Sequence, residues 1–269
     1  MSKVVLLTGG TDGIGYETAK SLLLLGHTVL LHGRNADKLE QAAQRLSEAD
    51  FRGTVRTFRA DLSRVSDVDQ LANQVAEDYQ TLDVLINNAG VFKSPVTVTA
   101  EGYDIRLIVN MVAPYVLTRA LLPMLAKDAR VVNLSSAAQQ AVDLISFTNK
   151  APLADSDAYA QSKLGLTMWS FHLAQSLGDN GPSIIAVNPG SFLGSKMVKE
   201  AYGADGHDLA IGADILTRAA LSDEFAQASG RYFDNDRQKF ASPHPDALNQ
   251  SKCEQLVQRI EHVIEDLRG

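Results

Sequence analysis

The sequence lacks the residues from which secreted and metal-binding domains are usually built. It has one cysteine, Cys253, in 269 residues, so no disulfide can form within the chain. Nothing therefore indicates an oxidising compartment. Its six histidines are scattered, and none has ligand spacing to another histidine or to the cysteine. A structural zinc site needs such spacing, so we expect no metal.

Positive charge and long apolar runs are also scarce. Lysine and arginine total 25 against 32 aspartates and glutamates, which gives a net charge of -7 without a long basic stretch. That balance disfavours nucleic acid and anionic membranes as partners. No apolar run reaches the length of a membrane-spanning helix, and the N-terminus becomes glycine-rich too soon for a signal peptide. We expect a cytoplasmic protein without a membrane anchor.

Short apolar runs alternate with longer amphipathic stretches along the whole chain. Hydrophobic residues make up 45% and charged residues 21%, as in ordinary globular proteins. The short runs lack a strict alternation of apolar and polar residues, which is typical of strands buried on both faces of a sheet. The predicted strands cover residues 3–7, 28–31, 54–58, 82–86, 130–134 and 183–187.

Helical patterns separate these strands, and no repeat, low-complexity tract or linker divides the chain. Asn35 is a predicted N-cap, and Gly26 and Gly178 are predicted helix ends. Alternating strands and helices imply βαβ units, so we expect an α/β fold. It is a single doubly wound Rossmann domain over residues 1–269, with a central parallel sheet of about seven strands and helices on both faces. The predicted helices cover residues 14–25, 36–49, 63–79, 101–125, 157–177 and 249–267.

The first predicted strand runs into a glycine-rich turn, residues 8–15 (TGGTDGIG), and a helix follows. Glycines permit a tight turn and let backbone N–H groups approach a pyrophosphate, which the helix N-terminus also attracts. The spacing differs from G-x-G-x-x-G. The turn predicts a dinucleotide site, and the alternative is a tight strand–helix connection without a ligand.

The second predicted strand ends at Gly33 and Arg34. An acidic residue near this point would hold the ribose 2′-OH of NAD and repel a 2′-phosphate. Gly33 has no carboxylate, whereas Arg34 offers a cation with a planar fork of donors. The pair favours NADP(H) over NAD(H), and the alternative is an arginine that faces solvent.

These features and several further motifs resemble those of the classical short-chain dehydrogenase/reductase family. The match is specific because the motifs occur in order over nearly the whole chain. The turn at residues 32–35 and the long gap before Tyr159 are similar to the retinol-dehydrogenase-like branch. The resemblance implies an NADP(H)-dependent oxidoreductase that interconverts a carbonyl and an alcohol by hydride transfer. The motifs after the glycine turn are Asn87-Asn88-Ala89-Gly90, Asn110, Ser135-Ser136, Tyr159-Ala160-Gln161-Ser162-Lys163 and Asn188-Pro189-Gly190.

Tyr159 and Lys163 lie one helical turn apart and share a face of a predicted helix. A phenol pKa, ordinarily about 10, has to fall by about 3 if the group is to act as a base near neutral pH. A neighbouring lysine cation favours the phenolate. Taken alone, the pair also fits an ordinary amphipathic helix. The resemblance implies that Tyr159 is the acid/base and that Lys163 also holds the nicotinamide ribose.

The resemblance implies two further catalytic residues. A serine after the fifth strand would donate a hydrogen bond to the substrate oxygen. Ser135 and Ser136 are both candidates, Ser136 fits the family pattern better, and either could instead cap a turn. Asn110 would join a proton relay to Lys163 through water. The alternative is a polar residue that bends its helix, where asparagine is disfavoured.

The resemblance also implies a set of cofactor-binding residues along the carboxyl ends of the strands. Within it, Asp61 would contact adenine, or it would only cap the next helix. The set comprises Gly9, Thr11, Gly13, Ile14, Gly15, Arg34, Asp61, Leu62, Asn88, Ala89, Gly90, Tyr159, Lys163, Pro189 and Gly190.

Three segments depart from the family pattern. The family usually carries a threonine after Gly190 that holds the nicotinamide carboxamide, whereas this chain has Ser191 and offers Ser195 as a replacement. Residues 137–157 are longer than usual and predict a flap near the substrate. Residues 191–212 fit the alternation of strands and helices poorly, and they form either a lid over the site or a simple surface loop.

The sequence does not name the substrate. The apolar character of the expected pocket, with Phe92 in its wall, favours a medium-sized apolar carbonyl compound. The long helices could pack across a two-fold axis, so a homodimer or homotetramer is expected. Two alternative functions stay open: a catalytically silent NADP-binding regulator of the same fold, and an epimerase or dehydratase of the extended family.

Overall fold

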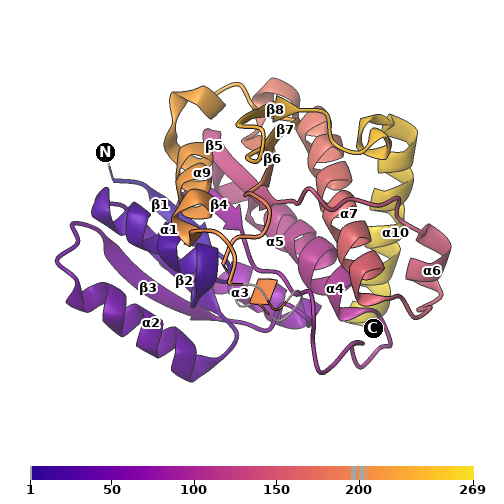
Figure 1. Cartoon of the computed structure of the whole chain (residues 1–269), viewed down its shortest axis with the longest axis horizontal. Helices are drawn as coiled ribbons and strands as arrows, with labels where there is room; N and C mark the ends of the chain where they lie inside the picture. Colours follow the sequence, from indigo (N-terminus) through magenta and orange to yellow (C-terminus); the bar gives the residue numbers. More distant parts are fainter. Residues whose placement is uncertain (1, 195–197, 200–202, 204) are drawn as a thin grey trace.

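The computed structural model describes residues 2–194, 198–199, 203 and 205–269, and it shows a central sheet between two layers of helices (Figure 1). The sheet has the strand order β3-β2-β1-β4-β5-β6-β7-β8. All neighbouring pairs are parallel except β7 and β8, which are antiparallel. The strands are β1 (Val4–Leu7), β2 (Thr28–Gly33), β3 (Thr54–Arg59), β4 (Leu82–Asn87), β5 (Leu125–Leu134), β6 (Ser183–Asn188), β7 (Arg231–Asp234) and β8 (Lys239–Ala241).

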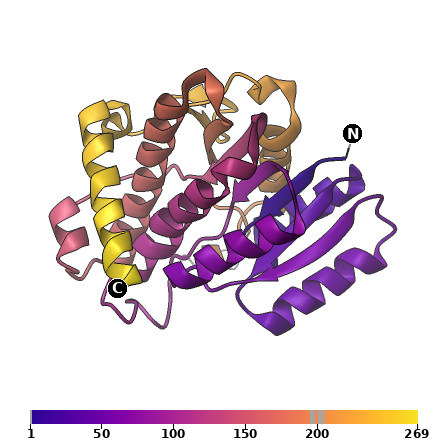
Figure 2. The same ribbon diagram turned by 180° about the vertical axis from the view of Figure 1, so that it is seen from behind.

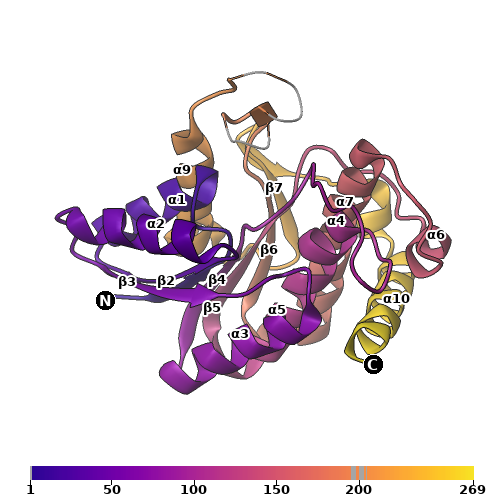
Figure 3. The ribbon, with the colours of Figure 1, turned by 90° about the horizontal axis from the view of Figure 1, so that it is seen from below.

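Helices cover both faces of the sheet (Figure 3). α1, α2 and α9 lie on one face, and α3, α5, α7 and α10 lie on the other, where Figure 2 shows them side by side. The longer helices are α1 (Gly13–Leu24), α2 (Ala36–Glu48), α3 (Val65–Asp78), α5 (Ala113–Leu121), α7 (Asp155–Leu177), α9 (Leu209–Leu221) and α10 (Gln250–Arg268). The shorter ones are α4 (Ile105–Leu107), η1 (Ile108–Val112), η2 (Leu122–Met124), α6 (Leu144–Thr148), η3 (Gly178–Asn180), η4 (Asp223–Phe225) and η5 (Pro245–Leu248).

The apolar strands are buried from both sides, as their composition predicts. In β1, Val5 and Leu7 pack into the core under α1 and α9, while Leu6 packs into the core under α3, α5 and α7. Successive side chains of a strand point to opposite faces, so a strand covered on both faces must be apolar at every position. The predicted doubly wound α/β fold is confirmed by this arrangement.

The sheet has eight strands where about seven were expected. The parallel part contains seven of them, and β8 adds a short antiparallel edge through Tyr232↔Ala241 and Phe233↔Phe240. The sequence analysis also missed α9, which packs against α1 and lies partly inside the segment 191–212. The expectation that Ser63 or Ser66 caps the third helix is wrong, since the N-cap of α3 is Arg64. The other predicted caps are correct: Asn35 accepts from the backbone N–H of Lys38 at 2.9 Å. Gly26 and Gly178 end α1 and α7 with positive φ.

The predicted helix over residues 101–125 begins later and is irregular. It starts at Ile105, widens into the π-turn η1, and ends in η2 before β5. The run Ile105–Met124 has a mean hydropathy of 1.5 and by length and composition alone could cross a membrane, which corrects the expectation that no apolar stretch is long enough. Of its most apolar window, 67% is buried within the fold. A buried core helix passes the same test, so this is weak support for a membrane span.

A buried ion pair joins the start of this helix to the start of α7. Arg106, whose side chain is 3% exposed, donates to Asp104 Oδ1 at 2.9 Å and to Asp104 Oδ2 at 2.5 Å. Its other guanidinium nitrogen contacts Asp155, the first residue of α7. Tyr159 follows one turn later on the same helix, so the pair fixes the end of α7 that faces the cleft.

We predict that Arg106→Met destabilises the fold strongly. Removing one partner leaves the Asp104 carboxylate buried without its cation, which costs about 3–5 kcal/mol in comparable pairs. The free energy of unfolding from urea titration should fall by this amount. Asp155→Asn is the matched control with a smaller expected loss, because the Asp155 side chain is 45% exposed. Equal stability of Arg106→Met and the parent chain would contradict the prediction.

Candidate active site

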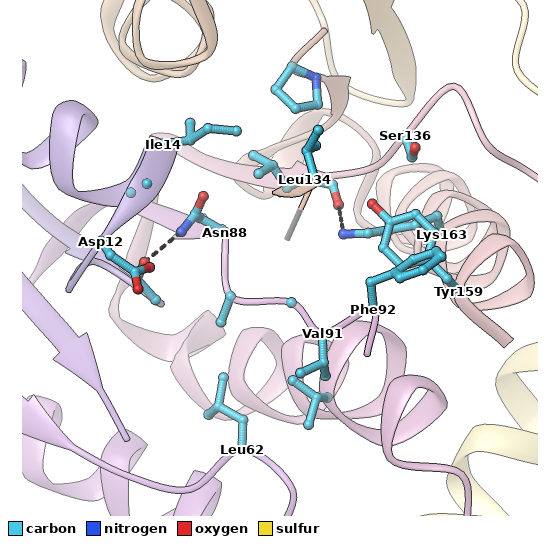
Figure 4. Close-up of a pocket in the computed structure, with 18 of the residues that line it drawn as sticks. Asp12, Ile14, Leu62, Asn88, Val91, Phe92, Leu134, Ser136, Tyr159 and Lys163 are labelled. Carbon is cyan, nitrogen blue, oxygen red and sulfur yellow. Dashed lines mark hydrogen bonds between the residues drawn. The ribbon is translucent and has the colours of Figure 1, made fainter. Parts of the chain in front are cut away.

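The carboxyl ends of the central parallel strands open onto a cleft of about 640 Å³ (Figure 4). The strand order reverses between β1 and β4, and open α/β sheets bind ligands at such a switch point. Asn110 lies behind the cleft wall, and every other residue predicted for the site lines the cleft. The lining residues from the prediction are Gly9, Thr11, Gly13, Ile14, Gly15, Arg34, Asp61, Leu62, Asn88, Ala89, Gly90, Ser136, Tyr159, Lys163, Pro189 and Gly190.

The turn after β1 and the turn after β4 are joined by hydrogen bonds. Thr8 Oγ1 accepts from the backbone N–H groups of Asn88 at 3.0 Å and Ala89 at 3.1 Å. Asn88 Nδ2 donates to the carbonyls of Thr8 and Gly9, both at 2.9 Å. Gly9 has a φ of +68°, and a Cβ there would lie 2.8 Å from Ala89 Cα. Glycine alone satisfies both constraints, and the result is a cradle in which a ligand can approach the backbone.

A buried histidine, which the sequence analysis did not single out, supports this cradle from below. The backbone N–H of Gly9 donates to His32 Nδ1 at 3.2 Å, so the ring proton is on Nε2, which lies 3.1 Å from the carbonyl oxygen of Ala60. Burial lowers the pKa of His32 to about 4, which keeps the imidazole neutral at neutral pH. The ring therefore links the glycine turn to the end of β3.

The end of the cleft beyond β2 is rich in cations. Arg34 and Lys38 both line it, and Lys38 lies in the first turn of α2 next to the N-cap Asn35. A Cβ at Gly33 would lie 2.5 Å from Thr11 Cγ2, so any side chain there, a carboxylate included, would require the Thr11 side chain to move. Lys38 was missed in the sequence because a lysine on an amphipathic helix carries no signal of its own.

The structure rules out the helix-cap interpretation of Asp61, and its contact with adenine stays a prediction. Asp61 lines the cleft, and its Oδ1 accepts from the backbone N–H of Ser63 at 3.0 Å and from Ser63 Oγ at 2.8 Å. These contacts shape the turn after β3. They do not cap α3, whose N-cap is Arg64 without a side-chain hydrogen bond.

The structure separates the two candidate serines after β5. Ser135 is buried, and its hydroxyl lies 2.7 Å from Thr167 Oγ1 inside α7. Ser136 is partly exposed, and Figure 4 shows it on the same side of the cleft as Tyr159 and Lys163. Its hydroxyl also accepts from the backbone N–H of Ala138 at 3.1 Å. Of the two, Ser136 is the serine that can reach a ligand in the cleft.

Tyr159 and Lys163 face the cleft from the second and third turns of α7 (Figure 4). Phe92, after β4, packs edge-on against the Tyr159 ring with the centroids 5.2 Å apart. Lys163 Nζ lies 5.6 Å from the centre of the same ring and donates to the carbonyl oxygen of Leu134 at 2.7 Å. The lysine is 4% exposed, and burial lowers its pKa to about 8. It is still a cation at neutral pH.

Asn110 lies in the π-turn η1 and holds the loop after β4. Its Oδ1 accepts from the backbone N–H of Val91 at 2.8 Å, and its Nδ2 donates to the carbonyl of Val91 at 2.9 Å. Nδ2 also donates to Ser162 Oγ at 3.0 Å, beside Lys163 on α7. π-turns are frequent at functional sites. The local irregularity agrees with the interpretation of Asn110 as a helix-bending residue, and a water-mediated relay to Lys163 stays a prediction.

The segments expected to cover the cleft contribute unequally. From residues 137–157, Ala137 and Ala138 line the cleft, while α6 packs its Phe147 edge-on against Tyr103 and lies next to α10. From residues 191–212, Ser191, Phe192 and others line it. Ser195, the candidate replacement for the threonine, lies outside the described residues. A flap and a lid stay predictions for these segments.

Apolar side chains also line the cleft. They include Phe92, Ile105, Val109 and Phe192. Among the described residues, no group of three or more histidine, cysteine or acidic side chains is placed to hold a metal ion. The arrangement suits an apolar ligand next to a phenol, a hydroxyl and an ammonium group.

Comparisons with known proteins agree with these features. A family model of short chain dehydrogenases matches residues 3–205. Retinol dehydrogenase 13 of Mus musculus is 30% identical, and the match covers 94% of this chain and 81% of that protein. A solved uncharacterised protein of Mycobacterium paratuberculosis has a TM-score of 0.79 with 26% identity, covering 98% of this chain and 93% of that one.

A metagenomic short-chain oxidoreductase solved in complex with NADP has a TM-score of 0.65 with 29% identity, covering 84% of this chain and 95% of that one. The fold, the order of the motifs and the extent of the sequence match therefore lead to one family. The chain belongs to the short-chain dehydrogenase/reductase family, in its retinol-dehydrogenase-like branch, and is an oxidoreductase that interconverts alcohol and carbonyl groups with a nicotinamide cofactor.

Proposed function

We propose that the enzyme uses NADP(H) and that Tyr159 is its acid/base. The grouping of Ser136, Tyr159 and Lys163 on one side of the cleft carries the proposal. The glycine cradle, in which added side chains would collide with neighbouring backbone, fits a dinucleotide across the other side. When bound, the nicotinamide supplies or accepts the hydride.

Tyr159, Ser136 and Lys163 have different roles in the proton transfer. In the direction of reduction, the Tyr159 hydroxyl donates its proton to the carbonyl oxygen, and the Ser136 hydroxyl donates a hydrogen bond to the same oxygen. The Lys163 ammonium favours the phenolate that remains, because it is a cation in a site from which water is largely excluded. In the direction of oxidation, the phenolate takes the proton from the alcohol.

We predict that Tyr159→Phe loses turnover and keeps NADPH binding. The variant retains the ring and its contact with Phe92 but has no proton to donate, and general acid–base catalysis contributes about 10²–10⁴-fold to a rate. Steady-state kinetics with a panel of apolar aldehydes and calorimetry with NADPH give the two readouts. Tyr79→Phe, at the end of α3, is the control and should behave as the parent chain. Turnover by Tyr159→Phe at the parental rate would rule out the proposed acid.

We predict that kcat/KM for carbonyl reduction falls as pH rises through about 8. The pKa of Lys163 is lowered to about 8, so its cation is present below that pH and lost above it. Loss of the phenolic proton would give a similar decline, and Lys163→Arg separates the two causes. A guanidinium stays charged throughout, so the residual activity of that variant should not show the Lys163 step. An unchanged step in Lys163→Arg would assign it to another group.

The cation-rich end of the cleft supports the preference for NADP(H). Arg34 and Lys38 can both meet a 2′-phosphate, and Arg34 can do so with two parallel hydrogen bonds. Position 33 is a glycine and offers no carboxylate that would bind a ribose 2′-OH and repel that phosphate, and a side chain there would require Thr11 to move. The NADP bound by the metagenomic relative supports the same conclusion by similarity.

We predict that Arg34→Asp shifts the preference from NADPH toward NADH by well over tenfold, about 1.4 kcal/mol or more. The substitution removes a phosphate ligand and adds a repelling charge. Lys38→Ala should shift the ratio in the same direction by a smaller amount. Arg45→Ala, on the outer part of α2, is the matched control. The ratio of kcat/KM values for the two cofactors is the readout, and an unchanged ratio in Arg34→Asp would exclude a contact with the phosphate.

The proposal extends to the class of substrate, the cellular location and the oligomeric state. The apolar wall around Phe92 and Ile105 supports a medium-sized apolar carbonyl or alcohol. A cytoplasmic location and a homodimer or homotetramer stay predictions. The silent regulator is the alternative that the Tyr159→Phe experiment addresses, since a regulator would bind NADPH and reduce no carbonyl.

A further inference from the structure

The turn after β6 is held by the turn between β7 and β8. Asn235 donates from its side chain to the carbonyl of Pro189 at 2.8 Å and from its backbone N–H to the carbonyl of Asn188 at 3.1 Å. The contact extends the parallel pairing of Asn188 with Asp234. The segment 188–191, part of which lines the cleft, therefore depends on residues that follow β7.

Asp236 accepts the shortest hydrogen bonds of this contact. Its Oδ1 accepts from the backbone N–H of Ser191 at 2.7 Å, and its Oδ2 accepts from Ser191 Oγ at 2.6 Å and from Asn188 Nδ2 at 2.9 Å. Burial alone would raise the pKa of Asp236, but these hydrogen bonds outweigh burial and lower it. The carboxylate is thus ionised at neutral pH, and hydrogen bonds to an ionised acceptor are stronger than neutral ones.

These contacts bear on the departure of the chain from the family pattern after Gly190. Ser191 stands directly after the Pro-Gly pair, but its hydroxyl and its N–H both point to Asp236. A hydroxyl that donates its proton to Asp236 cannot also donate to the oxygen of a nicotinamide carboxamide. Asp236 itself does not line the cleft, whereas Pro189, Gly190 and Ser191 do.

We infer that Asp236 is a positioning residue that fixes the nicotinamide-side turn, residues 188–191, through Ser191 and Asn188. The inference rests on the proposed function, in which the nicotinamide half of the cofactor lies against this turn. Asp236 restricts the turn to one arrangement, so that Pro189 and Gly190 meet the ring in a fixed place. Loss of Asp236 should therefore weaken binding of the nicotinamide half of the cofactor. It should leave binding of the adenosine half unchanged, because the proposed function puts that half at the ends of β1 and β2.

Two ligands distinguish an effect on the nicotinamide half of the cofactor from an effect on the adenosine half. NADPH carries both, whereas 2′,5′-ADP carries the adenosine and the 2′-phosphate without a nicotinamide. In Asp236→Asn, one oxygen still accepts but an amide N–H₂ faces the other donors. NADPH binding should weaken about tenfold, since a hydrogen bond to a charged group contributes about 1.5–3 kcal/mol. Binding of 2′,5′-ADP, measured by calorimetry on the full chain, should be unchanged.

Ser191→Ala provides a second variant, because it removes one donor and leaves the remaining contacts of Asp236. It should weaken NADPH binding in the parent chain and have no further effect in Asp236→Asn, since its hydroxyl acts only through the carboxylate. If Asp236→Asn does not fold, the split between the two ligands in Ser191→Ala carries the test. Asp128→Asn, at an exposed position of β5, is the control for charge and should bind both ligands as the parent does.

The outcomes distinguish the inference from the function on which it rests. If the parent chain binds neither NADPH nor 2′,5′-ADP, the proposed cofactor site is wrong and the inference fails with it. If the parent binds both, and Asp236→Asn binds NADPH equally well or loses both ligands to the same extent, Asp236 does not position the nicotinamide half. Selective loss of NADPH supports the inference.

Discussion

The site depends on a charged amine buried at the carboxyl end of β5. An ammonium group taken out of water loses several kcal/mol of solvation, even after the protein relaxes around it. Lys163 recovers part of that loss from the backbone carbonyl of Leu134, the last residue of β5. This contact holds α7 against the end of β5. The position of Tyr159, one turn earlier on the same helix, follows from that contact.

The second constraint is that the loops after β1 and β4 approach so closely that no side chain fits between their backbones at Gly9. The turn after β1 reaches the turn after β4 because Gly9 has no Cβ, and Thr8 and Asn88 then complete the contact through their side chains. His32 supports the same turn from the adjacent strand. One hydrogen-bond network thus connects the ends of the three neighbouring strands β2, β1 and β4. A ligand that binds there meets backbone groups already fixed in place.

The sequence was sufficient to predict the elements whose signal is local. Both-face burial makes β1 and the middle of β2 apolar, and the caps at Asn35 and Gly26 begin and end their helices by backbone chemistry that a few residues determine. The glycine turn was found from its own pattern, whereas the serine pair and Tyr159 were found because their motifs resemble those of the family in the same order along the chain. β7, β8 and α9 were missed because their burial is decided by neighbours far away in the sequence. The helix start at Ile105 was missed although its signal is local, since the Asp104 side chain caps it by accepting from the backbone N–H of Arg106.

Residues that hold the turns of the site in place could not be predicted from the sequence for the same reason. A histidine in an apolar strand and an aspartate in a turn after β7 are unremarkable until the fold places them against Gly9 and Ser191. The choice between Ser135 and Ser136 also needed the fold, because it depends on which hydroxyl α7 covers.

The contact between Thr11 and Gly33 has a consequence for how such a protein could diverge. The threonine methyl occupies the space that a side chain at position 33 would need. A substitution at Gly33 that introduces a carboxylate therefore requires the Thr11 side chain to move as well. A descendant that came to depend on NADH would have to adapt positions 33 and 11 together, so packing couples the two changes.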